Sequence, residues 1–144
     1  MAIPADPNKR HYMFTDDIKF LQKIVIYNTQ DNTFLILKRA AYHPTRPNEW
    51  DLPGGNVAFG QKHDASLLQE IQEETQLKVT NIKPIDVVTK FHNSIYLLYI
   101  GYKAEALTHE VMLSKEHVEY KWVTKEEFIE LNPADFLKNL VSIT

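Results

Sequence analysis

Hydrophobic residues near the start of the chain fall in two short runs separated by polar residues. The runs are FLQKIVIYN (20–28) and TFLILKR (33–39), and both have the composition of β-strands. The four residues between them (29–32, TQDN) are typical of a turn, so this part of the sequence predicts a β-hairpin. Residues 40–50 contain two prolines and many polar side chains, and we expect them to form a loop.

The clearest helical pattern covers residues 63–76 (HDASLLQEIQEETQ). On a helical wheel one side gathers the residues that we expect to pack on a core, namely Ala65, Leu68, Ile71 and Thr75, with Leu67 at the edge. Asp64 is placed to cap the start of this helix.

Three further strand-like runs follow, at 79–91, 94–107 and 117–123, and the second is apolar on both faces, as a central strand is. KEEFIEL (125–131) and PADFLKNLVSI (133–143) predict one or two short helices, with Pro133 in a first helical turn. Strands outnumber helices, so we expect an α/β (α+β) fold, an α/β/α sandwich around a mixed sheet.

The length of 144 residues fits one domain, which we place at 17–144 after an N-terminal lead-in at 1–16 that shows no periodicity. A net charge of −3 argues against nucleic acid as the main partner. The chain has no cysteine, no apolar signal segment and no apolar run long enough to span a bilayer. We therefore expect a cytoplasmic protein, monomeric or homodimeric, that has no membrane partner.

Three glutamates, Glu70, Glu73 and Glu74, stand on roughly the opposite side of the predicted helix at i, i+3 and i+4. Like charges at this spacing repel by about 0.2–0.5 kcal/mol per pair. No lysine or arginine within four residues shares their face, because Lys62 and Lys78 lie at or beyond the helix ends. A solvated acidic face is the common explanation of such a cluster, but oxygen ligands grouped in this way also suit Mg²⁺ or Mn²⁺.

The segment just before the helix, DLPGGNVAFGQ (51–61), holds three of the four glycines of the chain and predicts special backbone geometry. Together the two segments, WDLPGGNVAFGQKHDASLLQEIQEETQL (50–77), resemble the signature of the Nudix hydrolases, G-x5-E-x7-R-E-U-x-E-E-x-G-U, where U is a bulky aliphatic residue. The sequence matches at Gly55, Glu70, Ile71, Glu73, Glu74 and Leu77, and it departs at Gln61, Gln69 and Gln76. The flanking segments LILKR and EHVEYKWVTKEEFIEL are also typical of the family, so the resemblance covers residues 18–131.

The resemblance implies the Nudix fold and hydrolysis of a pyrophosphate bond in a nucleoside diphosphate linked to another group, with Mg²⁺ as the cofactor and Mn²⁺ as the alternative. The substrate would be a small nucleotide or a nucleotide-sugar. By similarity Glu73 and Glu74 would bind the metal, and Glu70 would bind it or accept the proton of the attacking water. The carbonyl of Gly55 would complete the metal shell. Glu116 matches the position of an extra acidic ligand, for which Glu119 is the competing candidate.

The three departures from the signature keep other functions open. Gln61 and Gln69 replace an acidic and a basic residue together, so we expect a neutral hydrogen bond between them in place of an ion pair. Gln76 should adopt a left-handed conformation at the helix end at a cost of about 1 kcal/mol. The alternatives are a non-catalytic Nudix-fold domain that binds a nucleotide or regulates, and an acidic interaction module without a ligand.

Other residues are weaker candidates for substrate binding. The resemblance implies that the strand ending at Arg39 leads into the site, and Arg46 lies in the following loop. Both are therefore candidates for phosphate contacts, against the alternative of ordinary exposed charges. Four aromatic residues are candidates for stacking on a base, although core packing is the more common role: Tyr42, Phe91, Tyr96 and Tyr99.

Overall fold

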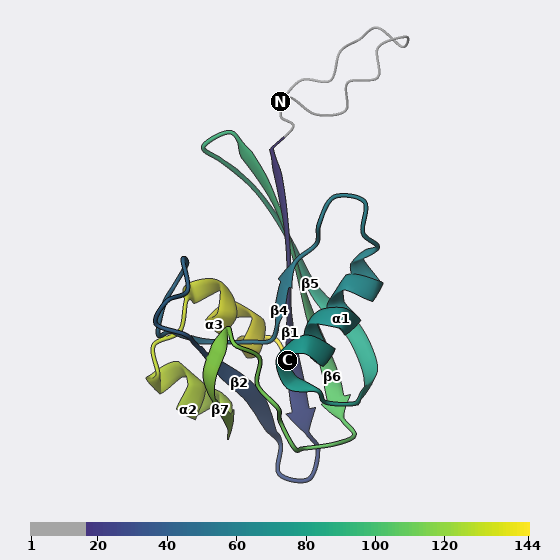
Figure 1. The fold of residues 1–144 in the computed structure, drawn as a ribbon, viewed down its shortest axis with the longest axis vertical. Helices are drawn as coiled ribbons and strands as arrows, with labels where there is room; N and C mark the ends of the chain where they lie inside the picture. The colour runs from purple at the N-terminus through teal and green to yellow at the C-terminus, as the bar shows by residue number, and fades with distance from the viewer. Residues whose placement is uncertain (1–16) are drawn as a thin grey trace, which may run out of the picture.

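The computed structural model describes residues 17–144, so the expected lead-in at 1–16 lies outside the described residues (Figure 1). The strands are β1 (Ile18–Asn28), β2 (Thr33–Arg39), β3 (Trp50–Asp51), β4 (Gly54–Asn56), β5 (Val79–His92), β6 (Ile95–Ala106) and β7 (His117–Val123). The helices are α1 (His63–Thr75), α2 (Lys125–Glu130) and α3 (Asp135–Ser142). None of these helices is long and apolar enough to cross a membrane.

All the strands of the described chain join one sheet with the order β3-β2-β1-β6-β5, to which β4 is added beside β1 and β7 beside β2. The pairing of β1 with β6 is parallel and the other pairings are antiparallel, which makes the sheet mixed. The predicted hairpin of β1 and β2 and the central place of β6 are confirmed. The short strands β3 and β4 were not predicted, because two or three residues carry no periodicity.

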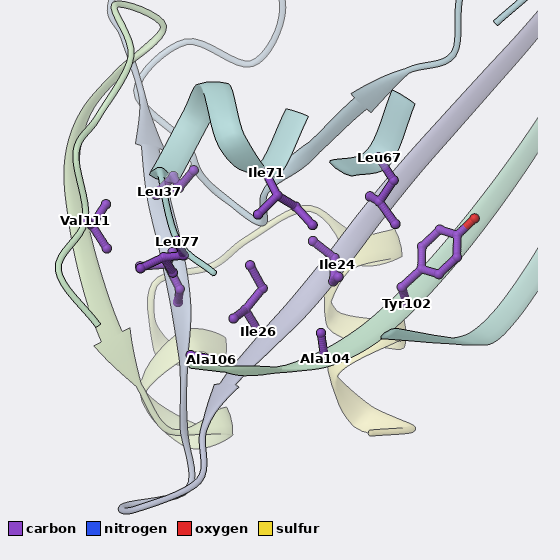
Figure 2. Packing of buried hydrophobic residues seen from close by; sticks show 11 residues of the cluster. Ile24, Ile26, Leu37, Leu67, Ile71, Leu77, Tyr102, Ala104, Ala106 and Val111 are labelled. Atoms are coloured by element: carbon purple, nitrogen blue, oxygen red, sulfur yellow. The ribbon is translucent and has the colours of Figure 1, made fainter. Parts of the chain in front are cut away.

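Helices cover both faces of the sheet, and alternation along β1 fills the two cores. Ile24 and Ile26 point toward α1, where they pack with Leu67 and Ile71 (Figure 2). Val25 belongs to the other core, which includes buried residues of α2 and α3. The expected α/β/α sandwich with a central mixed sheet is confirmed.

The packed face of α1 differs from the one that the helical wheel predicted. The buried residues of the helix are Ser66, Leu67, Ile71, Glu74 and Thr75. Leu68, which we expected in the core, is 52% exposed, whereas the side chain of Glu74 is 3% exposed. The wheel placed all three carboxylates toward solvent, but α1 turns one of them toward the glycine-containing strand β4, which it contacts.

Two smaller expectations about helix ends were wrong. The N-cap position of α1 is Lys62, which makes no side-chain cap bond, and Asp64 lies within the first turn, where its carboxylate accepts a hydrogen bond from the Ala65 amide. Pro133 precedes the N-cap residue of α3, Ala134, rather than lying in the first turn. Both expected residues nevertheless lie within two positions of the first residue of their helix.

Helix α3 lies directly on β6, and this contact places one wall of the cleft described below. A Cβ atom built on Gly101 of β6 would come within 2.3 Å of Leu140 of α3. Glycine at this position therefore permits the close approach of the helix. This close contact between α3 and β6 also brings Phe136, in the first turn of α3, beside Tyr99, which lies two residues before Gly101.

Gln76 ends α1 in the left-handed conformation that the sequence predicted, with φ 56° and ψ 19°, and its amide donates to the Gln72 carbonyl. Because glycine meets no Cβ penalty there, Gln76→Gly is expected to raise the free energy of unfolding by about 0.5–1 kcal/mol. Urea unfolding measures the change. The matched control, Gln72→Gly in the exposed interior of the same helix, should lower stability by about 1 kcal/mol. Equal effects of the two substitutions would contradict the assignment.

Candidate functional site

A cleft of about 1160 Å³ lies over one face of the sheet, between the C-terminal half of α1, the start of α3 and the segment before β7. Its floor is formed by β1, β5 and β6, and β4 forms part of one wall. All the candidate site residues predicted from the sequence line it: Gly55, Glu70, Glu73, Glu74, Glu116, Arg39 and Arg46. Glu119 is not among the lining residues and lies opposite Lys38 in the pairing of β2 with β7, so its placement favours Glu116 as the additional acidic group.

Glu74 is the most deeply buried carboxyl group of α1. Its Oε1 accepts a hydrogen bond from the Gly54 amide at 3.3 Å, and its Oε2 accepts none. A hydrogen bond between the side chains of Glu74 and Glu70 lowers the pKa of Glu70, although other effects outweigh it. Burial first, and then the negative charges of Glu70 and Asp51, raise the pKa of Glu74 well above its ordinary value, against the opposing effect of Lys23. A buried carboxylate oxygen without a partner is costly, and a cation would supply the missing interaction.

Glu70 lies one turn before Glu74, against the glycine strand β4. A Cβ atom on Gly55 would lie 2.9 Å from Cδ of Glu70 and 3.0 and 3.1 Å from its two carboxylate oxygens. Glycine at this position therefore leaves room for the Glu70 carboxyl group. Burial raises the pKa of Glu70, and the charges of Glu73 and Glu116 raise it further. Four acidic side chains therefore interact across the mouth of the cleft.

Glu73 is exposed, and its Oε1 accepts a hydrogen bond from Nε2 of Gln69 at 2.8 Å. Gln61 instead accepts from the amide of Ala58 at 2.9 Å. The expected hydrogen bond between Gln61 and Gln69 is therefore wrong. The reason is local geometry, because Gln69 and Glu73 are four residues apart on one helix and Gln61 closes a turn in the preceding loop.

These oxygen donors fit a hard divalent cation. Within residues 17–144 no three acidic or imidazole side chains already converge as a metal-binding group. Carboxylates this close together repel one another, so a closed arrangement requires a cation between them. The unpartnered Oε2 of Glu74 and the space that Gly55 leaves around Glu70 are the two features of the structure that match such an ion.

Beneath the cleft lies a buried ionic cluster that the sequence analysis did not identify. Asp51 is fully buried, and its Oδ2 lies 2.9 Å from Nζ of Lys23, 2.8 Å from Nη1 of Arg39 and 3.1 Å from Nη2 of Arg46. Burial alone would raise the pKa of Asp51, but the charges of these cations outweigh it and hold the pKa well below its ordinary value. The available signal was an acidic residue between Trp50 and Leu52, where only a paired charge is tolerated.

The two candidate arginines differ in the donors that they leave free. Arg39 is buried, and its guanidinium binds Asp51, the side chain and carbonyl of Thr45, and the ring of His43. Arg46 binds Asp51 through Nη2 only, and its Nη1 has no partner. The geometry thus gives Arg39 a role in holding the loop before β3, whereas Arg46 lines the cleft with a side chain that is 26% exposed, although its unpartnered Nη1 is itself buried.

The four aromatic candidates also differ in whether they line the cleft. Tyr99 lines the cleft, whereas Tyr42, Phe91 and Tyr96 are not among its lining residues. The hydroxyl of Tyr42 donates to the Lys115 carbonyl on an exposed part of the surface. Of the four residues named from the sequence, only Tyr99 is therefore placed to meet a ligand in this cleft.

The raised pKa of Glu74 predicts an unusual pH dependence for the metal-free protein. Between the ordinary carboxyl pKa of 4.5 and the raised value, the folded protein holds a proton that the unfolded chain has released. The free energy of unfolding should therefore fall as pH rises through this window. Urea unfolding in the presence of a chelator, from about pH 4 to pH 8, compares the protein with Glu74→Gln. The stability of the variant relative to the parent should increase with pH, and a constant difference would contradict the prediction.

Comparisons with known proteins show the family to which this chain belongs. The model of the NUDIX domain matches residues 22–141. Nucleoside triphosphatase NudI of Escherichia coli is 32% identical over 117 residues, which cover 72% of this chain and 83% of that protein. The protein of the same name from Shigella flexneri has the same identity and coverage.

Solved structures show the same fold. The MutT protein from Methanosarcina mazei Go1 superposes with a TM-score of 0.71 at 24% identity, covering 90% of this chain and 94% of the other. The MutT Nudix hydrolase from Burkholderia pseudomallei gives a TM-score of 0.74 at 18% identity, covering 90% and 99%. With the domain match over most of its length, the chain belongs to the Nudix hydrolase family.

Proposed function

We propose that the protein is a Mg²⁺-dependent hydrolase of a pyrophosphate bond in a nucleoside diphosphate-linked substrate, with nucleoside triphosphates as the first class to test. The single observation that carries this proposal is the buried Oε2 of Glu74, which has no partner and lies in a cleft shared with Glu70, Glu73 and Glu116. The nucleoside triphosphatase relatives support the choice of triphosphates. Mn²⁺ is the alternative cofactor, because it takes similar oxygen ligands.

Each acidic residue has a proposed role. Glu73, Glu74, Glu116 and the carbonyl of Gly55 hold the cation, which, when bound, neutralises charge on the phosphate oxygens. Glu70 contributes to the same site or accepts the proton of the attacking water. Its raised pKa suits a proton acceptor, since a base works best when its pKa is close to the working pH.

Positive charge on the opposite side of the cleft would position the phosphates. Arg46 lines the cleft, is partly exposed and has a buried Nη1 that no group of the described chain satisfies, so it is the proposed phosphate contact. Arg39 acts through the loop that carries Arg46, because both bind Asp51 and Arg39 also holds Thr45. This assignment makes Arg39 a positioning residue.

The experiment is a panel of nucleoside triphosphates, nucleoside diphosphate sugars and dinucleoside polyphosphates, incubated with Mg²⁺, with Mn²⁺ or with chelator. The expected result is metal-dependent release of a nucleoside monophosphate together with pyrophosphate or the remaining phosphorylated group. Release that continues in chelator would contradict the proposal.

A non-catalytic nucleotide-binding domain remains the second candidate, and the replacements Gln61, Gln69 and Gln76 favour it. Against it, Gln69 still orients Glu73 through a hydrogen bond. Gln69→Arg tests the choice in a Mg²⁺ titration. Activity in the parent protein supports the enzyme, whereas nucleotide binding without turnover in the parent, and turnover only in Gln69→Arg, would make the natural protein a binding domain.

A further inference from the structure

Another buried polar group without a hydrogen-bond partner belongs to a residue of β6 that lines the cleft. Tyr99 of β6 is 4% exposed, and no group accepts or donates a hydrogen bond at its Oη. Leaving a buried hydroxyl unpaired is costly, and phenylalanine would fill the same space without this cost. The hydroxyl therefore has no role in the fold that the described residues show.

The surroundings of Tyr99 are those of a site for a flat aromatic ligand. The half-buried ring of Phe136, from α3, meets the Tyr99 ring edge-on, with centroids 5.5 Å apart and an interplanar angle of 89°. Asp86 from β5 and Asn139 from α3 line the same cleft. This end thus offers an aromatic face together with a hydroxyl, a carboxylate and an amide for hydrogen bonding.

A continuous set of contacts connects this end of the cleft to the acidic end. The guanidinium of Arg46 lies 5.2 Å from the Phe136 ring centroid and also binds Asp51. Asp51 in turn binds Lys23, whose charge acts on Glu70 and Glu74. The cleft therefore runs from carboxylates, past a phosphate-binding arginine, to an aromatic and polar end. A nucleotide has its phosphates and its base in the same order.

We propose that Tyr99 and Phe136 form the base-recognition end of the cleft, where Phe136 stacks on the nucleobase and Tyr99 Oη hydrogen-bonds its edge. This inference rests on the proposed function, because it takes the glutamates as the phosphate end. Because the Tyr99 hydroxyl is buried, a base would reach it only if a neighbouring side chain moved, and Phe136 is the aromatic neighbour whose ring contacts that of Tyr99. Tyr99 and Phe136 are thereby specificity residues.

The test compares the protein with Tyr99→Phe on the four common deoxynucleoside triphosphates and on inorganic tripolyphosphate, which has no base. For the preferred nucleotide, kcat/KM should fall about tenfold, mainly because KM rises. A tenfold change is the effect expected from the loss of one good hydrogen bond. The ratio of kcat/KM between the best and the poorest base should shrink by a similar factor. Values for tripolyphosphate should not change.

Tyr96→Phe is the matched control, because Tyr96 lies on the same strand but does not line the cleft. It should leave every ratio unchanged. An equal loss on all substrates including tripolyphosphate, or no loss on any, would overturn the proposal.

Calorimetric binding of the same ligands separates this inference from the proposed function. If the parent protein cleaves none of them, hydrolysis fails as a proposal. A dissociation constant that depends on the base, and that loses this dependence in Tyr99→Phe, would still support base recognition. Equal affinity of the parent for tripolyphosphate and for every nucleotide would refute it.

Discussion

Replacing Glu74 with glutamine is expected to lower metal-dependent turnover by about 10²–10³-fold, the size of effect seen when one charge-stabilising group is removed from an active site. The amide has nearly the same shape and keeps an oxygen for the Gly54 amide, which donates to Oε1 at 3.3 Å. It has no charge to offer a cation at the position of the unpartnered Oε2. The measurement is kcat at saturating Mg²⁺ on the best substrate of the panel.

The stability of this variant should move in the opposite direction from its activity. Removing a buried carboxyl group whose pKa is raised eliminates an unfavourable ionisation, so Glu74→Gln should unfold at the same or a higher urea concentration in chelator. Glu130→Gln, on the exposed end of α2 and outside the cleft, is the control and should change neither property. A fully active Glu74→Gln variant would remove Glu74 from the proposed site.

Replacing Asp51 with asparagine is expected to cost about 3–5 kcal/mol of folding free energy, which is the penalty for breaking a buried ion pair by deleting one partner. The carboxylate is fully buried and binds three cations, of which Lys23 and Arg39 have side chains only 4% and 8% exposed. Without the Asp51 carboxylate, the positive charges of Lys23 and Arg39 would remain in the interior without a compensating negative charge. Urea unfolding measures the loss, and Asp86→Asn, at a half-buried carboxylate outside this cluster, should change stability by less than about 1 kcal/mol.

The pH dependence of the Asp51 effect follows from its lowered pKa. The folded protein keeps this group ionised at pH values where the unfolded chain has already taken up a proton, so its contribution is complete above the ordinary pKa of 3.8. The difference between the protein and Asp51→Asn should stay constant at neutral and mildly acidic pH and shrink only in strong acid. A difference that vanished near neutrality would show that the cluster does not stabilise the fold.

The sequence predicted the elements of this fold better than their orientation. Strong local patterns gave β2 and β7 with their observed ends and α1 to within one residue. The helical wheel failed for α1 because it placed all three carboxylates opposite the side that packs on the core, whereas Glu74 is buried against β4. A charge enters the interior only through contacts that tertiary structure supplies, and those contacts are invisible in local periodicity.

The candidate site shows the same limit. The motif identified the glycine and the glutamates that line the cleft, because their spacing along one segment is fixed. Asp51 and Lys23, which the sequence analysis did not identify, and Tyr99, which it named only among four aromatic candidates, come from separate strands that meet only in the folded sheet. Their importance lies in a shared ion cluster and an unpartnered hydroxyl, both of which depend on contacts between residues distant in sequence.

A calorimetric titration of Mg²⁺ into the substrate-free protein, beside Glu74→Gln, tests most directly whether the acidic face of α1 is a cation site. The account predicts saturable binding to the parent protein, with an affinity that rises with pH as Glu74 gives up its proton, and loss of that binding in the variant. Equal heats for the two proteins, or no saturable binding by the parent with either Mg²⁺ or Mn²⁺, would contradict it.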